Sequence, residues 1–108
     1  MTKVIVERER WYRGKGGEGS KLLIGHSGKM CCLGFAALAC GYSENQIVGR
    51  ATPGSIGWNL GHPLDNPESA DSVGLMYFND TYGMSDAERE SAIHEAGLKV
   101  ELDFEFVD

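Results

Sequence analysis

The adjacent thiols of Cys31 and Cys32 are the side chains of this sequence that come closest to a nucleophile. They stand at the start of an expected apolar helix, where the helix dipole and a nearby histidine would lower a thiol pKa. The candidate bases are His62 and His94, and Asp65 or Asn79 would orient one of them. This arrangement resembles a cysteine hydrolase only in outline.

Packing explains the same cysteines more simply. Free cysteine is among the most buried residue types, and the surrounding run 30–41 is apolar on every side. We therefore expect Cys31 and Cys32 in the core and assign no catalytic residue. A cysteine-dependent hydrolase remains the third functional hypothesis.

Phosphate and metal sites are also poorly supported. Gly14 and Gly19 have the spacing of P-loop glycines, but the pair Ser20-Lys21 reverses the required order and a strand is expected to follow. Zinc would need paired clusters of thiols and imidazoles, whereas Cys40 lies two turns away from the adjacent pair on the same helix. We expect no metal and no cofactor.

Two sets of residues are candidates for binding. The first would contact a protein partner through aromatic anchors and carboxylates, and consists of Trp11, Trp58, Tyr82, Glu101, Asp103 and Glu105. The second would surround a small ligand such as a nucleotide, and consists of Arg13, Lys15, Trp58 and His62. Tyr77 is expected in the core instead.

The first half of the chain predicts two strands and a buried helix. Residues 2–12 and 21–25 are rich in β-branched or aliphatic residues and flank a glycine-rich loop, which indicates a hairpin. Residues 30–40 favour a helix that is apolar all round and therefore central, and Gly41 is placed to end it. Ser43 and Gln46 have the spacing of a capping box for a short helix.

The second half predicts a long loop, a helix and a strand. Residues 49–72 hold all three prolines and no sustained period, so we expect a loop anchored by Ile56, Trp58 and Leu60. Residues 73–78 fit either a strand or a helical turn. Ser85 and Glu88 predict a capped helix over 86–96 that stops at Gly97.

The last ten residues before the C-terminal Asp108 alternate between apolar and mostly charged side chains, which is typical of a half-buried strand over 98–107. Its inner face is expected to cover the central helix. Together these elements predict one α+β domain over 1–108, with a small antiparallel sheet packed on a buried central helix and a C-terminal helix-strand unit.

Charge divides the chain into two unlike halves. Residues 1–50 carry eight Lys/Arg and four Asp/Glu, a net +4, whereas residues 51–108 carry two and twelve, a net −10. Such an acidic half repels nucleic acid and membrane surfaces and attracts basic proteins. Alternatively the halves neutralise each other within the fold, with residues 7–10 forming ion pairs beside the acidic last strand.

Three cysteines, two of them adjacent, argue for reduced thiols, and no run of the sequence reaches the roughly 18 apolar residues of a membrane span. The first ten residues become charged too early for a signal-peptide core. We expect a cytoplasmic location.

Several landmarks of the sequence resemble small uncharacterised accessory proteins of tailed bacteriophages and prophages. They are Trp11-Tyr-Arg-Gly14, Gly28-Lys-Met-Cys-Cys-Leu-Gly-Phe35, Asn79-Asp80, Arg89-Glu90 and the alternating C-terminal strand. The resemblance implies a role against host defence and a location in the host cytoplasm, and it carries over no catalytic residue.

The leading functional hypothesis is therefore a non-enzymatic, anti-CRISPR-like inhibitor that binds a host nucleic-acid-handling protein through an acidic surface, without direct contact to nucleic acid or membrane. The alternative is a protein that sequesters a small ligand or signal nucleotide. The sequence does not indicate an oligomeric state.

Overall fold

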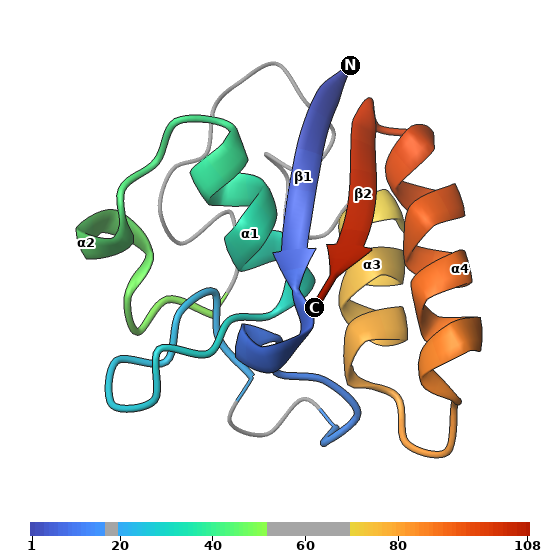
Figure 1. Cartoon of the computed structure of the whole chain (residues 1–108), viewed down its shortest axis with the longest axis horizontal. Helices are drawn as coiled ribbons and strands as arrows, with labels where there is room; N and C mark the ends of the chain where they lie inside the picture. Colours follow the sequence, from blue (N-terminus) through green and yellow to red (C-terminus); the bar gives the residue numbers. More distant parts are fainter. Residues whose placement is uncertain (17–19, 52–69) are drawn as a thin grey trace.

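The computed structural model describes residues 1–16, 20–51 and 70–108. Its elements are β1 (Thr2–Glu7), a 3-10 turn η1 (Arg8–Arg10), α1 (Cys32–Ala39), α2 (Glu44–Ile47), α3 (Ala70–Asp80), α4 (Asp86–Leu98) and β2 (Leu102–Val107). The strands lie side by side, with α1 beside β1 and α4 beside β2 (Figure 1). This arrangement confirms the α+β class.

The sheet is parallel, so the expected antiparallel pairing is wrong. Strands β1 and β2 run together from Thr2 opposite Leu102 to Glu7 opposite Val107. Parallel strands need a long crossover, and here all the helices lie between the two strands in sequence. The expected hairpin is also wrong, because Leu23 forms only an isolated bridge to Val48.

Helix α1 is the buried central element that its apolar sequence predicts. Every residue from Cys32 to Ala37 is buried, and the backbone reaches a φ of 103° at Gly41, where the helix has ended. The short helix α2 begins with the expected capping box of Ser43 and Gln46. These predictions are confirmed because each depends on local sequence.

Helices α3 and α4 pack against each other and close the core on the side of β2. The ambiguous segment 73–78 lies within α3 and is helical. Helix α4 begins as predicted, with the Ser85 hydroxyl accepting from the Glu88 backbone N–H at 3.2 Å. It continues past Gly97 to Leu98.

Gly97 is a close-packing residue and not a helix stop. A Cβ atom at this position would lie 2.5 Å from Cδ2 of Phe104 and 2.7 Å from the carbonyl oxygen of Leu102. The strand is correspondingly shorter than the predicted 98–107, because Leu98 ends the helix and residues 99–101 form the turn. Strand β2 packs mainly on α4, while β1 packs on α1.

Most of the expected loop 49–72, with its anchors Ile56, Trp58 and Leu60, lies outside the described residues. Among the helices of the described part, none has the length and apolar character needed to cross a membrane.

Candidate functional site

The cysteine pair is sealed in the core. Cys31 and Cys32 are both buried, and the sulfur of Cys32 lies 3.8 Å from the carbonyl oxygen of Leu75. Burial raises the pKa of the Cys31 thiol to about 11 and raises the pKa of Cys32 well above its ordinary value. Both thiols therefore stay protonated near neutral pH, which opposes nucleophilic chemistry.

His94, the candidate base within the described residues, is engaged elsewhere. His94 lies on α4, and its Nδ1 atom lies 3.1 Å from the carbonyl oxygen of Phe104 in β2. His62 and Asp65 lie outside the described residues. Asn79, the other candidate for orienting a base, has a structural role.

Asn79 is 1% exposed and joins three distant segments. Its Oδ1 atom accepts from the Nε1–H of Trp11 at 2.7 Å and from the backbone N–H of Cys32 at 3.0 Å. Its Nδ2 atom donates to the carbonyl oxygen of Tyr12 at 3.0 Å and to Oδ1 of Asp80 at 2.9 Å. This side chain thus ties the end of α3 to the start of α1.

Arg89 is the second buried polar residue, and it closes the turn between α3 and α4. Its Nη1 atom donates to the carbonyl oxygen of Phe78 at 2.7 Å, and its Nη2 atom donates to that of Met84 at 3.1 Å. The carbonyls at the end of a helix lack partners within the helix, so the guanidinium serves as a side-chain cap. Nothing in the local sequence distinguishes Asn79 or Arg89 from surface residues.

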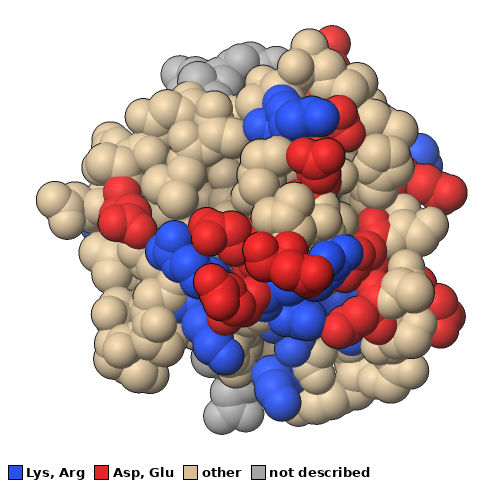
Figure 2. All heavy atoms as spheres, viewed as in Figure 1, with Lys and Arg blue, Asp and Glu red and all other residues tan. Residues whose placement is uncertain are grey.

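The face of the sheet that turns away from α1 carries the charged side chains of both strands. Lys3, Ile5 and Glu7 alternate with buried residues on β1, and Asp103 and Glu105 do so on β2. Figure 2 shows carboxylates gathered over the strands, with basic side chains between them. This open face is the main charged surface that the strands present.

Cations on the open face only partly neutralise its carboxylates. The Nζ atom of Lys3 lies 4.0 Å from both Asp103 and Glu105, so one exposed ammonium serves two carboxylates. Glu101 is exposed in the preceding turn and has a φ of 63°. Three carboxylates of the candidate set thus fall within five residues of sequence; Lys3 lies beside two of them, and Nδ1 of His94 lies 3.8 Å from Asp103.

Elsewhere the two halves of the chain do neutralise each other. Arg8 forms ion pairs with Glu90 at 2.8 Å and with Asp108 at 3.0 Å, and Arg13 pairs with Asp86 at 2.9 Å. These contacts join residues from the basic half to residues from the acidic half. Arginines of the first half therefore neutralise part of the acidity of the second half.

The aromatic candidates have separate positions. Trp11 is 2% exposed and packs against Phe106 with ring centroids 4.8 Å apart, so it belongs to the core and is not a surface anchor. Tyr82 is 72% exposed, and its hydroxyl donates to the carbonyl oxygen of Lys15 at 2.9 Å. Tyr77 is exposed, contrary to the expected core position. Trp58 lies outside the described residues.

The alternative ligand set is not assembled around one cavity in the described part of the chain. The guanidinium of Arg13 is held by Asp86 and lies 4.5 Å from the centre of the Trp11 ring. Lys15 instead lines a groove of about 350 Å³ with Tyr12, Ile24, His26, Ser27 and Lys29. His26 and Lys29 were not predicted as neighbours of Lys15, because only the folded chain places the turn that holds them beside Lys15.

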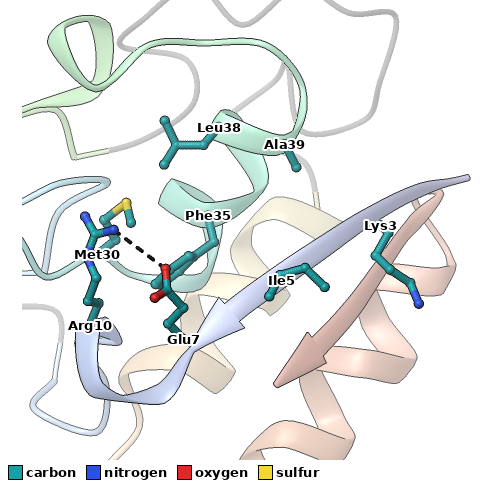
Figure 3. A pocket seen from close by; sticks show the side chains of 8 residues that line it. All are labelled: Lys3, Ile5, Glu7, Arg10, Met30, Phe35, Leu38 and Ala39. Atoms are coloured by element: carbon teal, nitrogen blue, oxygen red, sulfur yellow. Dashed lines mark ion pairs between the residues drawn. The ribbon is translucent and has the colours of Figure 1, made fainter. Parts of the chain in front are cut away.

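A second groove, of about 340 Å³, lies between β1 and α1. Figure 3 shows Ile5 and Glu7 on the strand side, with Phe35 and Leu38 on the helix side. Arg10 borders this groove and forms an ion pair with Glu7 at 3.7 Å. The groove is apolar on the helix side and charged on the strand side.

Within the described ranges, no cluster of three or more His, Cys, Asp or Glu side chains has the arrangement of a metal site. A scan against models of protein families gave no match to the chain. Searches of curated proteins and of solved structures likewise found no similar protein.

Proposed function

We propose that this protein is a non-enzymatic binding protein that uses the carboxylates of Glu101, Asp103 and Glu105 to bind a basic protein. The observation that carries the proposal is their location. Asp103 and Glu105 project from the open face of the sheet, and both lie near the same ammonium group of Lys3 at 4.0 Å. The pair therefore keeps a negative charge that is free to attract a partner.

The position of these carboxylates suits recognition of a surface and not of a small molecule. Asp103 and Glu105 lie on a regular strand whose other side is anchored by buried Leu102 and Phe104, and Glu101 lies in the turn directly before it. A strand of this kind holds its outward side chains at fixed spacing with little loss of freedom on binding. The hydroxyl of Tyr82 is bonded to the carbonyl oxygen of Lys15, and Trp11 is buried, so neither is assigned to this surface.

The chemistry of the partner follows from the charge of the surface. Proteins that handle nucleic acid present Lys- and Arg-rich grooves to phosphates, and a rigid row of carboxylates competes for such a groove. Together with the resemblance to phage accessory proteins, this favours an anti-CRISPR-like inhibitor of a host defence protein, acting by stoichiometric binding in the host cytoplasm.

A second candidate function is binding of a small anion such as a nucleotide. The observation in its favour is the groove of about 350 Å³ lined by Lys15, His26 and Lys29. Its size is at the lower end of the range for ligand sites. Thermal unfolding with linear and cyclic nucleotides tests this candidate, and an unchanged Tm across the series would contradict it.

The main proposal can be tested with two triple variants that change the net charge equally. The site variant is Glu101→Gln, Asp103→Asn and Glu105→Gln. The control is Glu9→Gln, Glu88→Gln and Glu95→Gln, whose carboxylates are exposed elsewhere. Glutamine at position 88 preserves the capping box with Ser85. Each protein is immobilised and used to capture proteins from a bacterial lysate at increasing salt.

We expect the unmodified chain and the control to capture the same basic, nucleic-acid-binding protein, with less capture at high salt. The site variant should lose that protein while remaining folded by circular dichroism. Added duplex DNA or RNA should compete with capture, because it occupies the same basic groove. Equal capture by the site variant and the control would refute the assignment of the acidic surface.

A further inference from the structure

Strand β1 has a free backbone edge on the side away from β2. In a parallel pair, alternate residues direct both N–H and C=O toward the partner strand. The backbone N–H of Thr2 donates to the carbonyl oxygen of Glu101 at 3.0 Å, which sets this alternation. Lys3 and Ile5 therefore direct their backbone groups, and Glu7 its N–H, to the other edge, where no other described segment pairs with them. The carbonyl of Glu7 instead accepts within the 3-10 turn η1.

The opposite edge of the sheet is covered, which makes the free edge of β1 a distinct feature. On β2 the outward carbonyl of Phe104 meets Nδ1 of His94 at 3.1 Å, and α4 packs along this strand. Beside β1, in contrast, lies the groove of about 340 Å³ whose far wall includes Phe35, Leu38 and Ala39. Figure 3 shows Glu7 pointing toward Arg10 on this side of the strand, whereas the Lys3 ammonium points toward β2. An unpaired strand edge is a template for another strand.

The three residues of this edge are complementary to a second copy of themselves. If two β1 strands pair antiparallel about a two-fold axis at Ile5, then Ile5 lies opposite Ile5 and Lys3 lies opposite Glu7 at both ends. In this arrangement the two Ile5 residues exchange two backbone hydrogen bonds, and each Glu7 N–H meets a Lys3 carbonyl of the partner, while the Glu7 carbonyl stays within η1. Their side chains share the open face, where opposite charges attract across strands.

We propose that the chain forms a two-fold symmetric dimer through this edge, which joins the two small sheets into one of four strands in the order β2-β1-β1-β2. Ile5 is 43% exposed in the single chain and would be covered at the centre of the interface. A two-stranded sheet is marginal alone, and four strands are stable more readily. The carboxylates proposed to bind a basic protein lie outside the new interface, and Lys3 borders both sites.

Charge reversal gives a test that depends on this pairing. In a dimer of the Lys3→Glu variant, the glutamate at position 3 of one copy faces Glu7 of the other. In a dimer of the Glu7→Lys variant, the lysine at position 7 of one copy faces Lys3 of the other. Each variant alone should dimerise roughly 10-fold to 100-fold more weakly, because two attractive pairs become repulsive. An equimolar mixture should form a heterodimer, since both facing pairs are then attractive. Matched controls are Lys29→Glu and Glu9→Lys, which make the same charge changes at exposed positions away from the edge.

Sedimentation velocity over a dilution series up to about 1 mM, where weak interfaces are also populated, measures the equilibrium. We expect dimers for the unmodified chain, both controls and the mixture, and monomers for each single variant at the same concentration. Circular dichroism checks that the variants are folded.

A monomeric unmodified chain at every concentration would overturn the proposal and leave the edge to an extended peptide of another protein. A dimer that is unaffected by either reversal would also overturn it, as would a mixture that stays monomeric. Loss of capture of a basic protein by the acidic-site variant would bear only on the proposed function.

Discussion

Replacing Asn79 by alanine should destabilise the protein severely, because this one side chain is bonded to two other segments, at residues 11–12 and at Cys32. The change removes its bonds to the indole of Trp11, the backbone N–H of Cys32 and the carbonyl of Tyr12. A buried hydrogen bond contributes about 1 kcal/mol, and an orphaned buried partner costs more. The expected loss in the free energy of unfolding is roughly 3 to 4 kcal/mol.

Such a loss is a large fraction of the total stability, since a domain of 108 residues has a free energy of unfolding of about 5–15 kcal/mol. It corresponds to a fall in Tm of about 15–25 °C at this size. Urea unfolding followed by tryptophan fluorescence measures the change, and Trp11 reports on the site itself. Asn45→Ala is the control, because Asn45 is exposed on α2.

The control should differ from the unmodified chain by less than about 0.5 kcal/mol, as surface substitutions usually do. A loss below about 1 kcal/mol for Asn79→Ala would refute the reasoning. It would mean that Trp11 and Cys32 find other partners or water, and that Asn79 does not connect α3 to α1.

Three further predictions concern the core. Gly97→Ala should lower Tm despite the better helix propensity of alanine, because its Cβ would lie 2.5 Å from the ring of Phe104. In the control Gly74→Ala the new Cβ meets nothing within 4 Å, so the free energy of unfolding should rise by up to about 1 kcal/mol. Equal effects of the two variants in thermal unfolding would contradict the close approach at Gly97. Arg89→Lys should cost about 2 kcal/mol in urea unfolding, since an ammonium cannot reach all the carbonyls that the guanidinium caps, and an unchanged midpoint would contradict that role. The buried thiol of Cys31 has its pKa raised from 9.0 to about 11, so the unfolded chain loses this proton first and the free energy of unfolding should fall as the pH rises between those values. Cys31→Ala should reduce this dependence of the free energy of unfolding on pH. An unchanged dependence would show that the thiol does not cause it.

The sequence predicted those elements that depend on neighbouring residues. The capping residues Ser43 and Ser85 mark the starts of α2 and α4, and the apolar run marks the buried helix α1. In each case the signal lies within a few residues of the feature it predicts. The α+β class follows from the same local signals.

The strand pairing could not be predicted in this way, because the register joins residues about a hundred positions apart. The alternation over 98–107 overestimated β2, since Leu98 and Val100 continue the pattern from the end of α4 and the turn. Gly97 has the sequence signature of a helix stop, but the structure requires glycine there because the helix packs closely against β2. Only the tertiary arrangement separates these explanations.

The outward position of some charged side chains could be predicted from the sequence. The charged positions of β2 follow from the period of the strand, so Asp103 and Glu105 could be named from the sequence. The burial of Trp11 could not, because it depends on Asn79 at the end of a distant helix. The ion pairs of Arg8 and Arg13 are equally non-local, and they decide which carboxylates remain available.

Zero-length cross-linking of the captured complex tests the central claim most directly. A carbodiimide joins carboxylates to lysines that touch them, and mass spectrometry identifies the joined residues. We predict cross-links from Glu101, Asp103 and Glu105 to lysines of a basic partner. Cross-links confined to Glu88 and Glu95, with none from the open face of the sheet, would contradict the account.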